Sequence, residues 1–123
     1  MISVNEYLMG RDKEFPLDML QARNMAELLS RVNWLFGTLE IHATVSSGYR
    51  PSALNNKIGG AKMSTHTVCA GIDLKDTEGF LAAKILDHLD LLEECGLWLE
   101  NPEVTVGWVH LDLKQRKSRI FNP

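Results

Sequence analysis

Two histidines and one aspartate are the residues whose types and spacing point most directly to chemistry. His66 and Asp73 lie in the stretch from Ser64 to Asp73, and His110 lies far downstream, in the stretch from Gly107 to Asp112. Two imidazoles and one carboxylate are a ligand set typical of a catalytic zinc ion, which keeps its fourth position for water. We therefore predict that His66, Asp73 and His110 bind Zn²⁺.

The residues between His66 and Asp73 favour an extended chain. On a helix the two side chains would lie about 10 Å apart, at ~1.5 Å rise per residue, which is too far to share one ion comfortably. Glycines precede and interrupt the stretch, and β-branched residues fill much of it. We predict a loop that carries His66 and turns into a strand that carries Asp73.

Two other interpretations of this stretch stay open. Cys69 follows His66 by three residues and could be a further metal ligand, although Asp73 and His110 already complete a set and a small buried thiol below the site is the simpler explanation. His66 and His110 could also be core histidines with ordinary hydrogen-bond partners. Cys69 and Cys95 are both expected to be free thiols, as in a reducing compartment.

Helices and short strands are predicted to surround these residues. The capping-box spacing of Ser3 and Glu6 predicts a short helix that stops by Gly10, and an amphipathic helix follows from Pro16 to Gly37. We expect a strand over 41–46, a short helix over 52–57 and one helix over 76–96. The buried face of that last helix is expected to hold Phe80, Leu81, Ile85, Leu89 and Leu92.

A C-terminal hairpin is expected to bring carboxylates towards His110. We predict strands over 97–100 and 106–113, with Glu100 roughly opposite Trp108. Alternation then places five side chains on one face: Trp98, Glu100, Trp108, His110 and Asp112. The basic tail over 114–119 is expected to be exposed, with Phe121 packing back onto the core.

Length and charge limit the class of protein. The 123 residues suit one domain over 1–123, and 45% hydrophobic residues can form a sizeable core. A net charge of −3 gives no electrostatic footprint for nucleic acid or an anionic membrane. The first 14 residues lack the apolar segment of a signal peptide and no run is long enough to span a membrane, so we expect cytoplasmic synthesis, with a monomer as the default.

Three separated motifs, in the same order, resemble one peptidase family. They are Ser47-Gly48-Tyr49-Arg50, the run from Ser64 through His66 to Asp73, and Trp108-Val109-His110. Over about 45–121 the chain is similar to the zinc D-Ala-D-Ala carboxypeptidases and peptidoglycan endopeptidases, which share a fold with Hedgehog signalling domains. The small members found in bacteriophages and prophages look most similar. The resemblance implies an α+β fold, with a small antiparallel sheet packed against helices.

The resemblance also implies roles for single residues. It carries the metal ligands over to His66, Asp73 and His110, and it carries the substrate-binding arginine over to Arg50. Ser64 matches the serine of the family pattern and is expected to orient a ligand beside the substrate. Trp108 is expected to line the cleft, although core packing explains it as well.

The chain departs from the family pattern at the catalytic base. Many relatives carry an acidic residue or a histidine two or three positions before the last ligand, where this chain has Trp108 and Gly107. The predicted hairpin makes Glu100 the first candidate for the base and Asp112 the second. Cys69 and Gly71 replace a Gly and an Ala of the pattern, which are substitutions between small residues.

The function that the resemblance implies is cleavage of the peptide stem or cross-link of bacterial peptidoglycan. Without a signal peptide, a phage lysin released through a membrane pore made by another protein fits best. Two other classes stay open. One is a wall-peptide-binding module of the same fold that has lost catalysis, and the other is a different zinc hydrolase that acts on a small amide.

Overall fold

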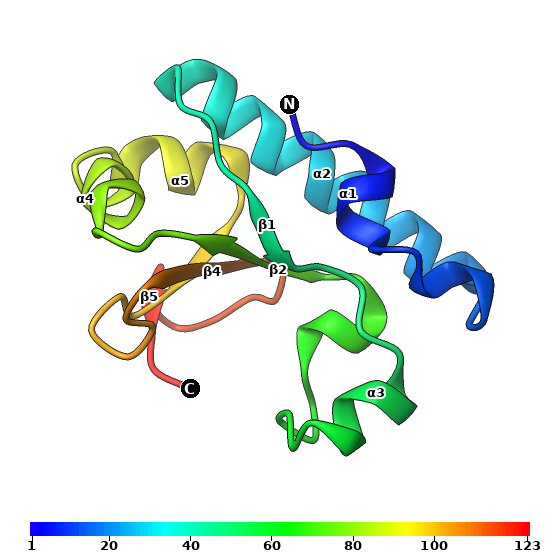
Figure 1. Ribbon diagram of the computed structural model, residues 1–123. Helices are drawn as coiled ribbons and strands as arrows, with labels where there is room; N and C mark the ends of the chain where they lie inside the picture. Colours follow the sequence, from blue (N-terminus) through cyan, green and yellow to red (C-terminus); the bar gives the residue numbers. More distant parts are fainter.

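The centre of the fold is a five-stranded sheet with the strand order β1-β2-β4-β3-β5 (Figure 1). The computed structural model describes all 123 residues. The strands are β1 (Val45–Ser47), β2 (Gly71–Lys75), β3 (Trp98–Glu100), β4 (Trp108–Asp112) and β5 (Ile120–Phe121). All neighbours are antiparallel except β3 and β5, which are parallel. The observed fold is α+β, as predicted.

The central pair of strands, β2 and β4, brings two distant parts of the chain into register. Asp73 lies directly opposite His110, and Ser47 of β1 lies opposite Asp73 on the other side. Asp73 therefore has a cross-strand partner on each side. Side chains of residues that lie directly opposite each other on adjacent strands are neighbours. β1 is shorter than the predicted strand over 41–46, because pairing begins only at Val45.

The N-terminal helices cover the sheet on the side that lies uppermost in Figure 1. Capping boxes begin both α1 (Val4–Leu8) and α2 (Met19–Leu39), at Ser3 and Asp18 respectively. The predicted stop at Gly37 is wrong, because α2 continues to Leu39 and ends where Glu40 adopts a left-handed conformation with φ 55°. The buried face of α2 comprises Leu28, Leu29, Val32, Leu35, Phe36 and Leu39.

The predicted helix over 76–96 is two helices, α4 (Phe80–Leu86) and α5 (Leu89–Cys95). The chain leaves helical geometry at His88, with φ −135°, and the His88 ring pairs with the carbonyl of Lys84. The apolar spacing runs unbroken across the two helices, so periodicity could not indicate this break. Phe80, expected in the core, is 74% exposed at the first residue of α4.

Three shorter elements complete the fold, and one of them, η2, carries His66. They are the 3₁₀ turns η1 (Arg11–Lys13) and η2 (Thr65–Val68), and the helix α3 (Ser52–Lys57). In Figure 1 α3 lies apart from the other helices, beyond the end of β1. No helix of the protein combines the length and the apolar character that a membrane span requires.

Candidate metal centre

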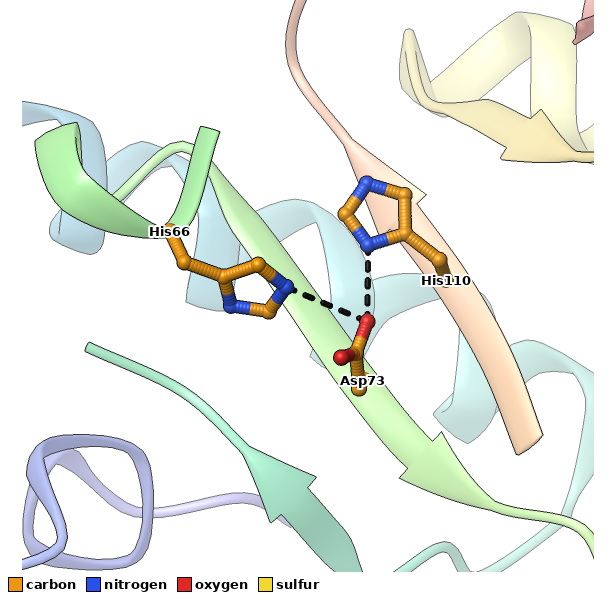
Figure 2. A group of neighbouring side chains, drawn as sticks. All are labelled: His66, Asp73 and His110. Carbon is orange, nitrogen blue, oxygen red and sulfur yellow. Dashed lines mark hydrogen bonds and ion pairs between the residues drawn. The ribbon is translucent and has the colours of Figure 1, made fainter. Parts of the chain in front are cut away.

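His66, Asp73 and His110 converge on one point, where each offers a ligand atom (Figure 2). Oδ1 of Asp73 lies 3.2 Å from Nε2 of His66 and 2.7 Å from Nδ1 of His110. The three ligand atoms all lie within 4.8 Å of one another, and all three residues are buried. Side chains from η2, β2 and β4 therefore form one compact donor set, as the sequence predicted.

The turn η2 fixes the direction of His66. The Ser64 hydroxyl accepts a hydrogen bond from the backbone N–H of His66 at 3.2 Å, and the Ser64 carbonyl accepts one from the Thr67 hydroxyl at 2.8 Å. The turn ends at Cys69, which adopts a left-handed conformation with φ 58°. Ser64 thus lies beside the donor set as a helix cap, a role that its spacing from His66 explains.

The second ring nitrogen of His66 has its own partner. Nδ1 of His66 donates to the carbonyl of Gly48 at 2.8 Å, which leaves Nε2 facing Asp73. A side chain at Gly48 would collide with the carbonyl of Tyr7 in α1. Gly48 therefore allows α1 and the segment after β1 to approach closely enough to hold the ring, as second-sphere carbonyls commonly do for ligand histidines.

His110 is held from behind by Asp112. Nε2 of His110 lies 2.8 Å from Oδ2 of Asp112, whose side chain is fully buried. The same carboxylate accepts hydrogen bonds from Nη2 of Arg116 at 2.8 Å and from the backbone N–H of Lys114 at 3.2 Å. The Arg116 guanidinium stacks on the ring of Phe121 at 3.6 Å. The tail after β4 thus buttresses the carboxylate that orients His110.

Two pKa values show how strongly these groups interact. Burial by itself would raise the pKa of Asp73, but hydrogen bonds from His110 and His66 outweigh it and lower the pKa to about 2. Burial by itself would lower the pKa of His110, but the Asp112 and Asp73 carboxylates raise it to about 9. The metal-free protein therefore carries an anionic Asp73 beside a cationic His110 at neutral pH.

The donor set fits a zinc ion. Zinc accepts imidazole nitrogen and carboxylate oxygen, and a catalytic site uses three protein ligands with one open position. Each histidine directs one nitrogen to Asp73 and has its other nitrogen bound to an oxygen acceptor, which is the second-sphere pattern of ligand histidines. Cys69 is not in this donor set, and burial raises its pKa to about 12, so its thiol remains protonated.

A cavity of about 320 Å³ opens onto the donor set. Besides the three candidate ligands it is lined by four residues that the sequence singled out: Arg50, Ser64, Glu100 and Trp108. Asp112, the second candidate for the base, does not line it. The structure therefore brings seven of the eight predicted site residues to one cavity and places the eighth behind His110.

Glu100 reaches this cavity through a register that differs from the predicted one. Leu99 of β3 pairs with Leu111 of β4, so one further step places Glu100 opposite His110 rather than Trp108. The difference is two residues, so the side chains that share a face are unchanged. Burial raises the pKa of Glu100 above its ordinary value, an effect that the nearby His110 partly offsets.

Arg50 is held by residues that sequence reasoning did not single out. Its Nη1 donates to Oδ1 of Asn55 at 3.1 Å and its Nη2 to the Ser47 hydroxyl at 3.1 Å, while Nη2 lies 3.8 Å from Oδ2 of Asp73. Asn55 is buried and donates to the carbonyl of Ala61. These contacts fix the guanidinium at the edge of the donor set, and only Ser47, inside a motif, could have been found in advance.

The two departures from the family pattern have different consequences. Cys69 stands in place of Gly at a residue with positive φ, where Gly is the residue with no steric cost. Gly71 stands in place of Ala where a Cβ would collide with Oγ1 of Thr65 and lie 2.9 Å from Cε1 of His110. Position 71 of this chain therefore requires Gly, whereas position 69 tolerates a Cys with a strained backbone.

Comparison with known proteins identifies a family and nothing closer. The family model described as Peptidase M15 matches residues 5–112, which contain all three candidate ligands. No curated protein and no solved structure matches the chain. The match covers most of the chain and agrees with the donor set and the cavity beside it. The chain therefore belongs to the Peptidase M15 family of zinc D-Ala-D-Ala carboxypeptidases and is by that membership a metallopeptidase.

Proposed function

We propose that this protein is a zinc-dependent peptidase that cleaves the peptide stem or cross-link of bacterial peptidoglycan. The observation that carries the proposal is the juxtaposition of the His66–Asp73–His110 donor set with Glu100 and Arg50 in one cavity. The donor set supplies a metal position, Glu100 a proton acceptor and Arg50 a carboxylate-binding fork. Family membership supports the reaction class, since Peptidase M15 comprises zinc peptidases.

The metal position would be held by Nε2 of His66, Oδ1 of Asp73 and Nδ1 of His110. A zinc ion bound there supplies Lewis-acid polarisation of a carbonyl and lowers the pKa of a bound water to ~7. The protein itself orients the two imidazole rings. The carbonyl of Gly48 accepts a hydrogen bond from His66, and the carboxylate of Asp112 contacts His110.

Glu100 is the residue that we propose as general base. It lines the cavity on the strand beside His110, and burial raises its pKa above its ordinary value, which favours proton acceptance. Its carboxylate would take a proton from the attacking water and deliver it to the leaving amine. This role replaces the acidic residue or histidine that many relatives carry just before the last ligand.

Asp112 is better suited to positioning than to proton transfer. Its side chain is fully buried, and His110, Arg116 and the N–H of Lys114 already occupy its oxygens. A base must reach the water or substrate proton directly or through one water. We therefore propose that Asp112 holds His110 in the orientation that presents Nδ1 to the metal, and that it does not itself accept the proton.

Arg50 is the residue that we propose for binding a substrate carboxylate. Asn55 and the Ser47 hydroxyl each occupy one terminal nitrogen of the guanidinium, and the side chain still lines the cavity. A fixed guanidinium matches the planar geometry of a carboxylate. Peptidoglycan stems carry several carboxylates, which agrees with a carboxylate-binding role for Arg50.

We propose that the protein acts on the wall as a phage-type lysin after its release from the cytoplasm.

A peptidoglycan digest tests the proposal. Zinc-loaded protein is incubated with purified peptidoglycan, a chelator-treated sample serves as control, and the fragments are identified by mass spectrometry. New peptide termini that disappear with the chelator would establish the peptidase and name the bond. Glu100→Gln should lower the rate by at least about 100-fold, because general-base catalysis typically contributes 10²–10⁴. Glu103→Gln, an exposed neighbour outside the cavity, should not change the rate.

Other outcomes of the digest separate the remaining possibilities. Zinc binding with an intact wall would favour the binding module that lost catalysis. Cleavage of free dipeptides without cleavage of the wall would favour a hydrolase of small amides. If Asp112→Asn abolishes turnover while zinc remains bound and Glu100→Gln is fully active, Asp112 is the base and the assignment made above is wrong.

A further inference from the structure

We propose that Lys114 forms a second carboxylate-binding subsite, on the opposite side of the metal centre from Arg50. The inference rests on the proposed peptidase function and specifies its substrate: a peptide with a carboxylate on each side of the scissile bond. Three cationic side chains line the cavity, namely Arg50, Lys114 and Arg116. Their surroundings differ, and that difference singles out Lys114.

Lys114 is the cavity cation without an acidic partner. Arg50 lies 3.8 Å from Oδ2 of Asp73, and Arg116 lies 2.8 Å from Oδ2 of Asp112 and stacks on Phe121. Lys114 is exposed and takes no part in any ion pair of the protein. Its ammonium is therefore available to a ligand, whereas the charge of Arg116 is already balanced.

The charge of the cavity favours an anionic ligand. Its lining side chains carry three positive charges, on Arg50, Lys114 and Arg116, and two negative charges, on Asp73 and Glu100. Histidines apart, Arg50 and Lys114 offset Asp73 and Glu100 before a metal ion is bound, because Asp112 already balances Arg116, in a chain whose net charge is −3. A bound Zn²⁺ would then make the cavity positive. A positively charged cavity attracts anionic ligands even in a protein whose net charge is negative.

A chain of contacts places Lys114 and Arg50 on different sides of the donor set. Arg50 approaches Asp73, which contacts Nδ1 of His110. The other ring nitrogen of His110, Nε2, contacts Asp112, whose Oδ1 accepts a hydrogen bond from the backbone N–H of Lys114. Arg50 follows β1 and Lys114 follows β4, and these strands are two positions apart in the sheet. Two strand spacings are roughly 10 Å, about three residues of extended peptide.

This spacing has a consequence for the substrate. A peptide that crosses the metal centre between the two cations would place one carboxylate at Arg50 and another at Lys114. The scissile bond would then lie between two acidic groups a few residues apart. Stem peptides with free carboxylates fit this arrangement better than stems in which those groups are amidated.

Amidated peptides test the subsite. The substrates are N-acetylated L-Ala–γ-D-Glu–meso-diaminopimelate–D-Ala–D-Ala and three versions of it, each with one carboxylate converted to an amide. The zinc-loaded protein is compared with Lys114→Gln, and with Lys117→Gln as the matched control, because Lys117 is exposed in the same tail but lies outside the cavity. Cleavage gives kcat/KM, and calorimetry gives the affinity of each peptide.

We expect one amidation to lower kcat/KM by about two- to fivefold in the unmodified protein, as for an ion pair at a partly exposed position. Lys114→Gln should remove the discrimination at that one carboxylate, and Lys117→Gln should keep it. Unchanged discrimination in Lys114→Gln would overturn the subsite while leaving the peptidase intact. If no peptide is cleaved but calorimetry shows the same Lys114-dependent discrimination, the subsite stands and the proposed peptidase fails.

Discussion

Gly71 is a residue on which the geometry of the donor set depends directly. Its Cα faces Oγ1 of Thr65 and Cε1 of His110 with no room for a Cβ. Gly71→Ala should therefore displace His110 and lower zinc affinity by at least about tenfold, the scale of second-sphere disruptions. The measurement is a competition titration against a chromophoric zinc chelator.

Two further variants separate this local effect from a general loss of stability. Adding Thr65→Ala to Gly71→Ala removes one of the two collisions and should restore part of the zinc affinity. Gly37→Ala, at an open position of α2, should leave zinc affinity unchanged. Unaltered zinc affinity in Gly71→Ala would show that the ring of His110 can move without cost.

His110 should make the stability of the metal-free protein depend on pH. Its pKa is about 9 in the folded protein, against an ordinary value of 6.5. A group with a raised folded-state pKa stabilises the fold below its unfolded pKa and loses that contribution as the pH rises through its folded pKa. We therefore expect the free energy of unfolding to fall between about pH 6.5 and 9, in urea titrations with a chelator present.

A matched pair of histidine variants checks the origin of this pH dependence. His110→Gln should flatten the decline, whereas His88→Gln, on the helical layer away from the donor set, should keep it. An NMR titration of the His110 ring in the metal-free protein would give its pKa directly. A value near 6.5 would contradict the double carboxylate contact.

The sequence could single out the candidate ligands but not how their side chains are held. His66, Asp73 and His110 are residue types with known metal chemistry, in motifs that a family shares. The role of Asp112 depends on contacts from Arg116 and Phe121, which fold back from the C-terminal tail. No local pattern encodes such contacts, so the sequence left Asp112 among the candidate bases.

At the scale of elements, side-chain faces were more predictable than boundaries and registers. The hairpin of β3 and β4 is displaced by two residues from the predicted register, yet Glu100 and His110 share a face, because side-chain direction repeats every two residues. The helix over 76–96 was predicted as continuous because its apolar spacing is continuous. Its break at His88 comes from backbone geometry that apolar periodicity does not record.

Asp76 connects the strand that carries Asp73 to the helix that follows. It is buried, and its two oxygens accept the N–H groups of Leu81 at 2.9 Å and Ala82 at 2.8 Å. Asp76→Ala should lower the free energy of unfolding by about 1–2 kcal/mol, because free N–H groups at a helix start lose their acceptor. Urea titration measures this, and the exposed Glu78→Ala should change stability by less than about 0.5 kcal/mol. Equal effects of the two variants would contradict a capping role.

At the scale of the whole molecule, zinc binding should be linked to folding. The candidate ligands come from η2, β2 and β4, and they meet only when the sheet has formed. A ligand that binds the folded state alone stabilises it by RT ln(1 + [L]/Kd), about 2.7 kcal/mol at 100 times Kd. Urea titrations should shift by this amount when free zinc is raised to that level. The double variant His66→Gln, His110→Gln should show no shift, and a shift in it would point to zinc binding elsewhere.

β4 lies between β2 and β3 in the sheet but follows both in the sequence. The donor set can therefore be completed only late in the synthesis of the chain. His110 is 44 residues beyond His66, and its strand must enter the sheet beside β2, which was made earlier. A ribosome-bound chain that ends before β4 thus has no complete chelate. If the donor set also forms after the transition state for folding, zinc should slow unfolding and leave the rate of refolding unchanged, which stopped-flow measurements with and without zinc would test. The metal would then stabilise the folded protein without taking part in the folding of the chain.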